Sequence, residues 1–242
     1  MKARLGAYGL WQLRDFVFER AAAILIVALL LVFGSYEAIG PAANAYIAGG
    51  GRNALFFGAR GVAEHLGLMW FIASLIAVHG ISANDRSTGR YRLIFAKPVR
   101  VLPYYAQAFV LHGICLMLLS LVWLAALSRV LPVGGRTASS AIVILACSYM
   151  LVGGVCFLMS AITRFDWVAT GAVYGGVLYL ASKFRGAWWL GPLPPFWRIP
   201  EQLDLVKTLD PLETKPLLWV TAYGVACFLL GLIILKRRPL AT

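Results

Sequence analysis

Five basic side chains stand close together in the segment Asn84–Tyr105, between two strongly apolar runs. They are Arg86, Arg90, Arg92, Lys97 and Arg100, accompanied by a single acid, Asp85. Positive charge interspersed with apolar side chains suits a short helix that docks in a groove of a partner protein. It equally suits a loop held to anionic lipid headgroups. By the positive-inside rule, a basic loop between membrane-length runs indicates the cytoplasmic face of a membrane.

The composition indicates an integral membrane protein. Apolar residues make up 61% of the 242 residues and charged residues only 13%, with a mean hydropathy of +0.79. This length accommodates about six spanning helices of roughly 20 residues each and leaves no soluble domain. The net charge is +12, and the basic residues are spread over the ends of the apolar runs. We therefore expect them to contact anionic membrane lipids and not nucleic acid.

The apolar runs predict an all-α polytopic membrane protein with one domain, residues 1–242. We expect an interfacial helix over about residues 5–19 and six transmembrane helices over about 21–38, 62–83, 104–127, 140–162, 167–182 and 217–235. Residues 5–19 are alternatively an extension of the first span. The fifth span is short, so we expect the aromatic and proline-rich segment Gly186–Trp197 to be partly re-entrant from the outer side. The densest basic clusters place both termini inside.

The histidines raise the question of electron transfer. His65 and His79 share one face of a predicted helix about 21 Å apart, an arrangement that membrane cytochromes use to hold two haems. Two bis-histidine haems need four histidines, and with His112 the chain has only three. We therefore favour histidines satisfied by headgroups or neighbouring helices and keep haem ligation as an alternative.

Other polar side chains in or near the predicted spans are candidates for a translocation path, because ionisable groups are costly in hydrocarbon and often functional. The candidates are Glu37, Glu64, His65 and Tyr174. Tyrosines also gather at membrane interfaces without lining any path, so that interpretation stays open.

Gly171 and Gly175 place small residues about one turn apart on the fifth predicted span, a spacing that permits the close approach of another helix. The other helix could belong to a second copy of the chain or to another span of the same chain. Gly153 and Gly154 offer a similar contact in the fourth span.

The sequence carries no catalytic motif. It has no GxxxxGK[ST] phosphate-binding loop, no HExxH and no paired acids, so we expect neither an ATPase nor another enzyme. The four cysteines fall inside apolar runs and indicate no disulfide framework, and we expect no metal site. Asp166 is most simply the acid at the start of the fifth helix.

The residues of the basic segment follow a defined order of types. In sequence they are Asp85, Arg86, Gly89, Leu93, Ile94, Pro98, Val99, Arg100 and Tyr105. This order resembles the loop after the second span in the permease subunit of type-2 ATP-binding-cassette (ABC-2) exporters. There an acid and an arginine, a glycine and a short apolar stretch commonly precede Pro-Val-Arg and an aromatic residue. The layout of the spans is similar over the whole chain.

The resemblance implies a permease subunit that exports a substrate across a bacterial inner membrane, as a homodimer or with a paralogue. A separate ATP-binding-cassette ATPase would bind ATP and Mg²⁺, and this chain would hold no cofactor. The region Trp188–Trp197 would form an outer gate. The ATPase-coupling residues would be Asp85, Arg86, Gly89, Arg90, Arg92, Pro98 and Arg100. The alternative function is a membrane anchor of a redox or assembly complex, with or without haem.

Overall fold

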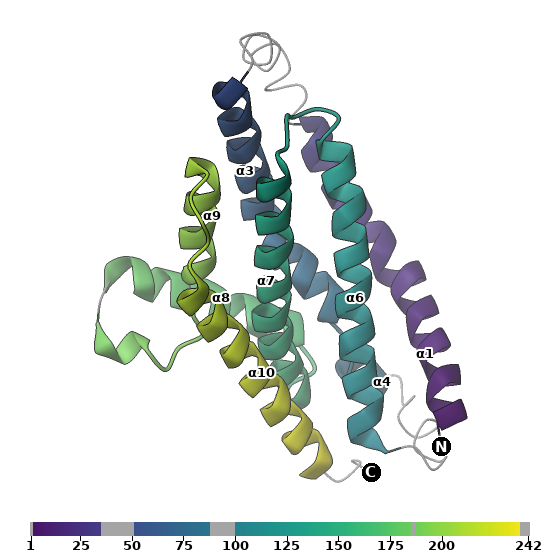
Figure 1. The fold of residues 1–242 in the computed structure, drawn as a ribbon. Coiled ribbons are helices and arrows are strands. Elements are labelled where there is room, and N and C mark those ends of the chain that lie inside the picture. The colour runs from purple at the N-terminus through teal and green to yellow at the C-terminus, as the bar shows by residue number, and fades with distance from the viewer. Residues whose placement is uncertain (1, 35–50, 88–99, 185–186, 238–242) are drawn as a thin grey trace.

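Every regular element of the described chain is a helix. The computed structural model describes residues 2–34, 51–87, 100–184 and 187–237, and Figure 1 shows them as a bundle of long helices. A helix satisfies its backbone hydrogen bonds internally, as a segment surrounded by hydrocarbon requires. The all-α class predicted from the sequence is confirmed.

Within the described residues, five helical segments are long and apolar enough to cross a membrane, so the protein is membrane-embedded in character. They are Tyr8–Gly34, Asn53–Asp85, Val101–Leu127, Gly135–Ile162 and Thr214–Arg237. Four of the helices in these segments begin several residues before the predicted spans, because hydropathy marks only the apolar part of a helix. They are α3 (Gly51–Val78), α6 (Val101–Leu127), α7 (Gly135–Ile162) and α10 (Thr214–Arg237).

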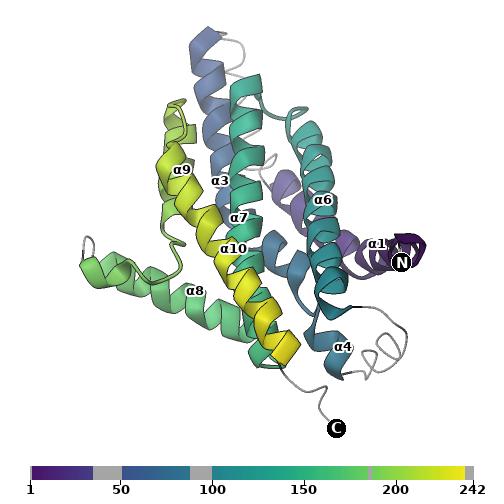
Figure 2. The same cartoon turned by 60° about the horizontal axis from the view of Figure 1, so that its bottom comes forward.

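The predicted fifth span is helix α8, Asp166–Lys183, which is not among the five candidate spans. Its 18 residues reach only about 27 Å, less than the roughly 30 Å of a hydrocarbon layer. Both Figure 1 and Figure 2 show α8 leading away from α7 and α10. The chain then returns through a short 3-10 helix, Trp188–Leu190, to α9, Arg198–Thr208. The count of six spans and the re-entrant segment stay predictions.

The N-terminal segment is helical without interruption into the first span. Helix α1 covers Lys2–Phe16 and passes through a π-helical turn, Val17–Ala21, into helical residues 22–34. A π-helical turn is a common cause of a bend in a helix. Figure 2 shows α1 pointing away from the long helices. An interfacial position for residues 5–19 stays a prediction.

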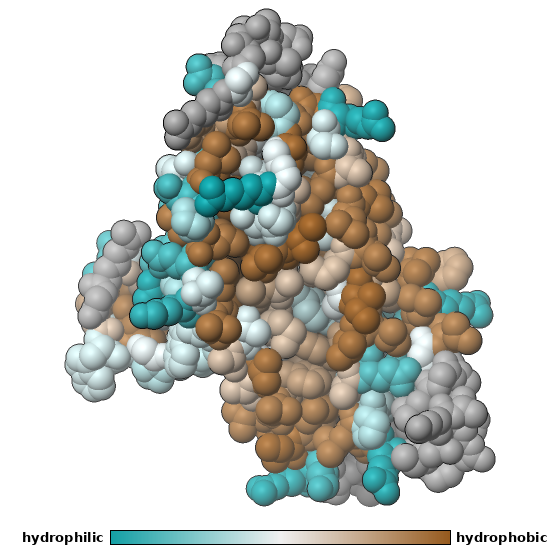
Figure 3. Space-filling model, viewed as in Figure 1, coloured by the Kyte–Doolittle hydropathy of each residue, from teal (hydrophilic) through white to brown (hydrophobic). Residues whose placement is uncertain are grey.

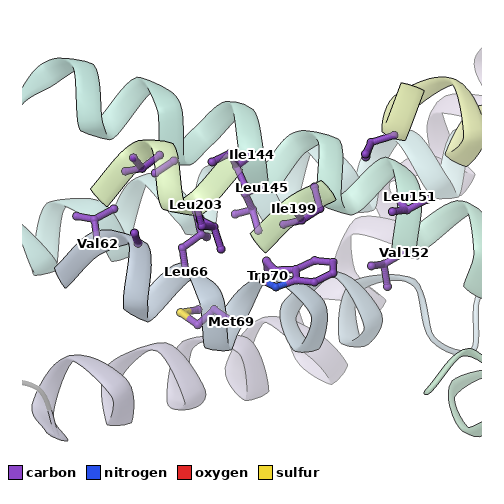
Figure 4. Packing of buried hydrophobic residues seen from close by; sticks show 14 of the residues in the cluster. Val62, Leu66, Met69, Trp70, Ile144, Leu145, Leu151, Val152, Ile199 and Leu203 are labelled. Atoms are coloured by element: carbon purple, nitrogen blue, oxygen red, sulfur yellow. The ribbon is translucent and has the colours of Figure 1, made fainter. Parts of the chain in front are cut away.

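Apolar side chains of α3, α6, α7, α8, α9 and α10 contribute to the larger of two core clusters in the described residues, and Figure 4 shows part of it from close by. The residues labelled there are Val62, Leu66, Met69, Trp70, Ile144, Leu145, Leu151, Val152, Ile199 and Leu203. The second cluster includes Phe16, Phe109 and Phe157. Helix α1 begins and helix α10 ends toward the same end of the bundle (Figure 1).

Large apolar side chains also cover much of the outer surface. Figure 3 shows brown over most of the middle of the face drawn, with teal residues mainly toward its ends and edges. Leu118, Leu121 and Leu230 on the long helices are about half exposed. Soluble monomers rarely expose apolar surface on this scale, so the surface suits contact with hydrocarbon.

Helices α7 and α10 approach each other through glycine. A methyl carbon at Gly154 would lie 2.1 Å from the carbonyl oxygen of Gly224, and one at Gly224 would lie 2.1 Å from that of Met150. Only residues without a side chain let two helix backbones come this near. The expectation of close packing at Gly154 is confirmed, and Gly153 packs against the side chain of Val78.

Candidate functional site

Helix α3 breaks immediately before the basic loop. Residues 79–82 form a turn, and the short helix α4, Ala83–Ser87, follows. Gly80 has φ = +77° in this turn, a left-handed conformation that favours glycine. A side chain there would also meet the amide of Asn84 at 2.6 Å. The chain therefore changes direction inside the last turn of the predicted second span, residues 62–83, just before the coupling loop.

A buried carboxylate fastens this turn to the start of α8. Asp166 is fully buried, with Oδ1 2.8 Å from Nδ1 of His79, while Oδ2 accepts a hydrogen bond from the Gly80 N–H at 2.9 Å. A carboxylate only accepts, so we assign the imidazole proton to Nδ1 of His79. The N–H of Trp167 also donates to Oδ1, at 2.8 Å. Asp166 is thus the helix-start acid that the sequence indicates, and it also ties α8 to the α3 break.

A buried arginine connects the same turn to α6. Arg20, in the π-helical turn, donates from Nη2 to the carbonyl oxygen of His79 at 2.9 Å. Its Nη1 lies 2.8 and 3.0 Å from the two ring nitrogens of His112. Because Nδ1 of His112 also lies 2.9 Å from the carbonyl oxygen of Ala77, we assign the proton to Nδ1, and Nε2 accepts from Arg20. This assignment makes His112 a neutral imidazole.

We call Arg20, His79, His112 and Asp166 the polar junction. Their hydrogen bonds link the π-helical turn, the α3 break, α6 and the start of α8. The sequence analysis did not predict this cluster, because it gave Arg20 no partner and expected headgroups or neighbouring helices to satisfy the histidines without naming the residues that do so. The available signal was that all four are ionisable residues at or within the apolar runs, where such groups need partners.

The structure places the side chains of two predicted coupling residues. Asp85 is buried in α4, whereas Arg100 is exposed at the N-cap of α6. The backbone of Arg86 belongs to α4. The two placed side chains therefore stand at the two described ends of the loop. The remaining coupling residues, Gly89, Arg90, Arg92 and Pro98, lie outside the described residues.

Among the candidate path residues, Glu37 lies outside the described residues. Glu64 is exposed on α3 and pairs with Arg60, one turn earlier, at 2.9 Å. Tyr174 of α8 is half-buried and stacks on Phe71, with 3.9 Å between the ring centroids. Glu64 and Tyr174 thus have different surroundings, and a path that includes them stays a prediction.

All three histidine rings are engaged by the protein. His65, the remaining path candidate, is buried with its ring nitrogens 2.6 and 3.2 Å from the carbonyl oxygens of Gly61 and Leu31. His79 and His112 belong to the polar junction. A bis-histidine haem would require such rings to leave their hydrogen-bond partners. Within the described ranges, no three histidine, cysteine or acidic side chains gather as a metal site would require.

Gly171 and Gly175 lie on an open face of α8. A methyl carbon at either position would meet nothing within 4 Å, and the same holds at Gly176. In the described part of the chain, these glycines therefore do not support a close contact between α8 and another span. A contact with a second copy stays a prediction.

No family model matches the chain, and no curated protein matches it. Its function is therefore argued from its own residues and their geometry.

The polar junction suits the transmission of force better than it suits chemistry. A displacement of α4 would act on Asp166 through the N–H of Gly80, and on Arg20 through the carbonyl group of His79. The first contact belongs to α8, and the second leads through Arg20 to α6. A displacement of α4 or of the α3 break would therefore also displace α6 and α8.

Proposed function

We propose that the chain is the transmembrane permease subunit of an ABC-2 type exporter in a bacterial inner membrane, with both termini inside. Five apolar helices make it membrane-embedded in character, and the basic segment resembles the coupling loop of that family. The sequence contains no phosphate-binding motif, so ATP and Mg²⁺ belong to a separate ATP-binding-cassette ATPase. A second copy or a paralogue completes the exporter.

The observation that carries the proposal is that the segment leading into the loop is hydrogen-bonded to several helices of the bundle. Helix α4, with the buried side chain of Asp85, directly follows the α3 break, which the polar junction fastens to α6 and α8. A membrane protein without its own ATPase must receive force from a partner at its surface. A loop rooted in this way would deliver that force to several helices, whereas a loosely attached loop would absorb it.

In the proposed cycle, ATP-driven closure of the ATPase subunits pushes on the loop, and α3 and α6 move with it. A cavity between the two copies then opens outward, with the open face of α8 around Gly171 and Gly175 at their contact. The region Trp188–Trp197 acts as the outer gate. An apolar and aromatic cavity of this kind is compatible with lipids, peptides, drugs or polymers as substrates.

Co-purification with charge-reversal variants tests the proposal. We expect a tagged chain, isolated from its native membrane, to bring down an ATP-binding-cassette ATPase whose activity it stimulates. Arg86→Glu and Arg92→Glu should weaken both assembly and stimulation. Arg237→Glu, a matched charge reversal at the exposed end of α10, should change neither. Unchanged assembly and ATPase stimulation in both loop variants would exclude the coupling role.

Topology gives a second, independent test. Cysteine placed at Ser87, in α4, should react with an impermeant thiol reagent only from the cytoplasmic side. Labelling only from the external medium would overturn the orientation and the transport proposal with it.

The competing function, a membrane anchor of a redox complex, predicts a cofactor-bearing partner. The engaged histidine rings favour transport over haem ligation by this chain.

A further inference from the structure

A cleft of about 520 Å³ lies between the second half of α8 and the start of α9. Small-molecule sites in proteins have volumes of roughly 300–1,000 Å³, so a ligand fits here. Leu178, Ala181 and Ser182 form the α8 wall of the cleft, and Leu190 of the 3-10 helix adds to its apolar surface. Of the described residues that line the cleft, none belongs to the polar junction.

The α9 wall of the cleft is charged. Arg198, Glu201 and Asp204 line it, because α9 buries its other, apolar face in the larger core cluster. Nη1 of Arg198 donates to Oε2 of Glu201 at 2.8 Å, and Nζ of Lys207 donates to Oδ1 of Asp204 at 2.8 Å. Two positive and two negative charges are therefore paired along α9, so this wall does not favour a simple cation or a simple anion.

The two walls require different surroundings. Water would solvate Arg198 and Glu201, but it would leave the apolar surface of Leu178 and Leu190 hydrated, which is unfavourable. A hydrocarbon chain alone would cover the leucines but would remove water from the ion pair, which is also unfavourable. An amphipathic molecule, with its apolar part against α8 and its polar part against α9, satisfies both walls.

Aromatic side chains near the cleft favour a membrane lipid as that molecule. Trp188, in the same 3-10 helix as Leu190, is 90% exposed. Tyr179 in α8 and Phe184 at its C-cap are also exposed. Exposed aromatic residues of this kind gather where the hydrocarbon of a membrane meets the headgroups. A lipid whose headgroup lies at that level can place an acyl chain in the cleft.

We propose that the cleft binds one zwitterionic phospholipid, with an acyl chain against Leu178 and Ala181 and the headgroup at Arg198 and Glu201. The side chains of Arg198 and Glu201 are 43% and 50% exposed, so a headgroup can reach both. The bond to Glu201 uses Nη1 of Arg198, and other N–H groups of the guanidinium can donate to the lipid phosphate. Oε1 of Glu201 can accept from the lipid ammonium group. An anionic headgroup offers a phosphate to Arg198 but no cation to Glu201.

Lipid retention by the full chain tests this site. The detergent-purified protein is incubated with phosphatidylethanolamine or with phosphatidylglycerol, and native mass spectrometry measures how much of each stays bound. We expect phosphatidylethanolamine to be retained about tenfold more tightly than phosphatidylglycerol, because only the former supplies a charged donor to Glu201. The measurement requires no ATPase, so its result does not depend on the proposed transport function.

Two variants change the cleft in opposite ways. Ser182→Trp should abolish retention, because an indole at this exposed position fills the cleft from the α8 wall. Ser139→Trp is the matched control and should retain lipid as the wild type does. Ser139 is exposed on α7 and, like Ser182, donates from Oγ to the carbonyl oxygen three residues earlier. Glu201→Gln should reverse the preference toward phosphatidylglycerol, and this gain tests the site even if Ser182→Trp fails to fold.

Several results would overturn the proposal. They are retention of neither lipid by the wild type, equal retention by the wild type and Ser182→Trp, and an unchanged lipid preference in Glu201→Gln. A photoactivatable acyl chain should label the peptide that contains Leu178 and Ala181. If that peptide is instead cross-linked to a second copy of the chain and takes no lipid label, the occupant is the second copy and the lipid proposal is wrong.

Discussion

Replacing Asp166 by alanine tests whether the polar junction holds the root of the loop to α8. Three donors lose their acceptor in Asp166→Ala: the His79 ring, the Gly80 N–H and the Trp167 N–H. The His79 side chain is 42% exposed and can turn to water, whereas Gly80 is buried at the α3 break. The loss therefore falls mainly on the two backbone donors.

The size of the effect follows from those contacts. A buried donor left without an acceptor costs about 1–3 kcal/mol, and a hydrogen bond to a charged acceptor contributes about 1.5–3 kcal/mol. We discount the His79 contact because solvent screens it. The buried Gly80 contact dominates, because the Trp167 contact is only part-buried, and the loss then amounts to about 2–4 kcal/mol. For a chain of this length, that corresponds to a fall of roughly 10 °C in Tm.

Thermal unfolding of the detergent-purified protein measures this fall, with stimulation of the partner ATPase as a second readout. Asp204→Ala is the control, because Asp204 is 71% exposed and its pair with Lys207 contributes less than about 1 kcal/mol. Asp166→Asn keeps one acceptor oxygen, so we expect an intermediate Tm and reduced stimulation while the protein is folded. If Asp166→Ala and Asp204→Ala have the same Tm, the reasoning is refuted.

Three further substitutions probe other parts of the fold. Gly224→Ala should destabilise the protein by about 1–3 kcal/mol, because its methyl group would approach α7 to 2.1 Å, whereas Gly171→Ala, at an open site, should not lower Tm. If the Gly224→Ala protein had the same Tm as the wild type, the close contact between α7 and α10 would be contradicted. Gly80→Ala should lower stability by about 1–2 kcal/mol, measured by denaturant unfolding, because alanine disfavours φ = +77°. Arg20→Met should abolish ATPase stimulation, because it breaks the link between the α3 break and α6, whereas Arg14→Met, an exposed change on the same helical run, should retain it.

The sequence predicted the helical class and the approximate positions of the long helices, because long apolar runs leave the backbone no alternative in hydrocarbon. It placed the helix starts less well. The second span was predicted from residue 62, but α3 begins at Gly51. Exposed residues such as Arg60 lower the hydropathy of this stretch without ending the helix. Hydropathy therefore identifies the residues that lie in the hydrocarbon layer and not the residues at which the helix begins and ends.

The polar junction could be predicted only in part. The role of Asp166 at the start of α8 is local, since its carboxylate accepts from the next residue, and the sequence indicated it correctly. Its bond to His79 joins residues 87 positions apart, and the bond from Arg20 to His112 joins residues 92 positions apart. Helical periodicity assigns faces within one helix and does not specify which faces meet. These contacts depend on how α3 breaks and on how α6 and α8 pack around the break.

The chemistry of the polar junction differs from that of the other helix contacts in a way that bears on function. Helices α7 and α10 are held by glycine and apolar packing, which is sufficient for stability in a membrane. A buried charged network adds little stability over apolar packing, but it does fix which donor meets which acceptor. The start of α8 therefore cannot slide along the α3 break without losing hydrogen bonds. Because α8 is fastened to the α3 break at Asp166 and is open at Gly171 and Gly175, movement of the break would reach the proposed contact between copies through a single helix.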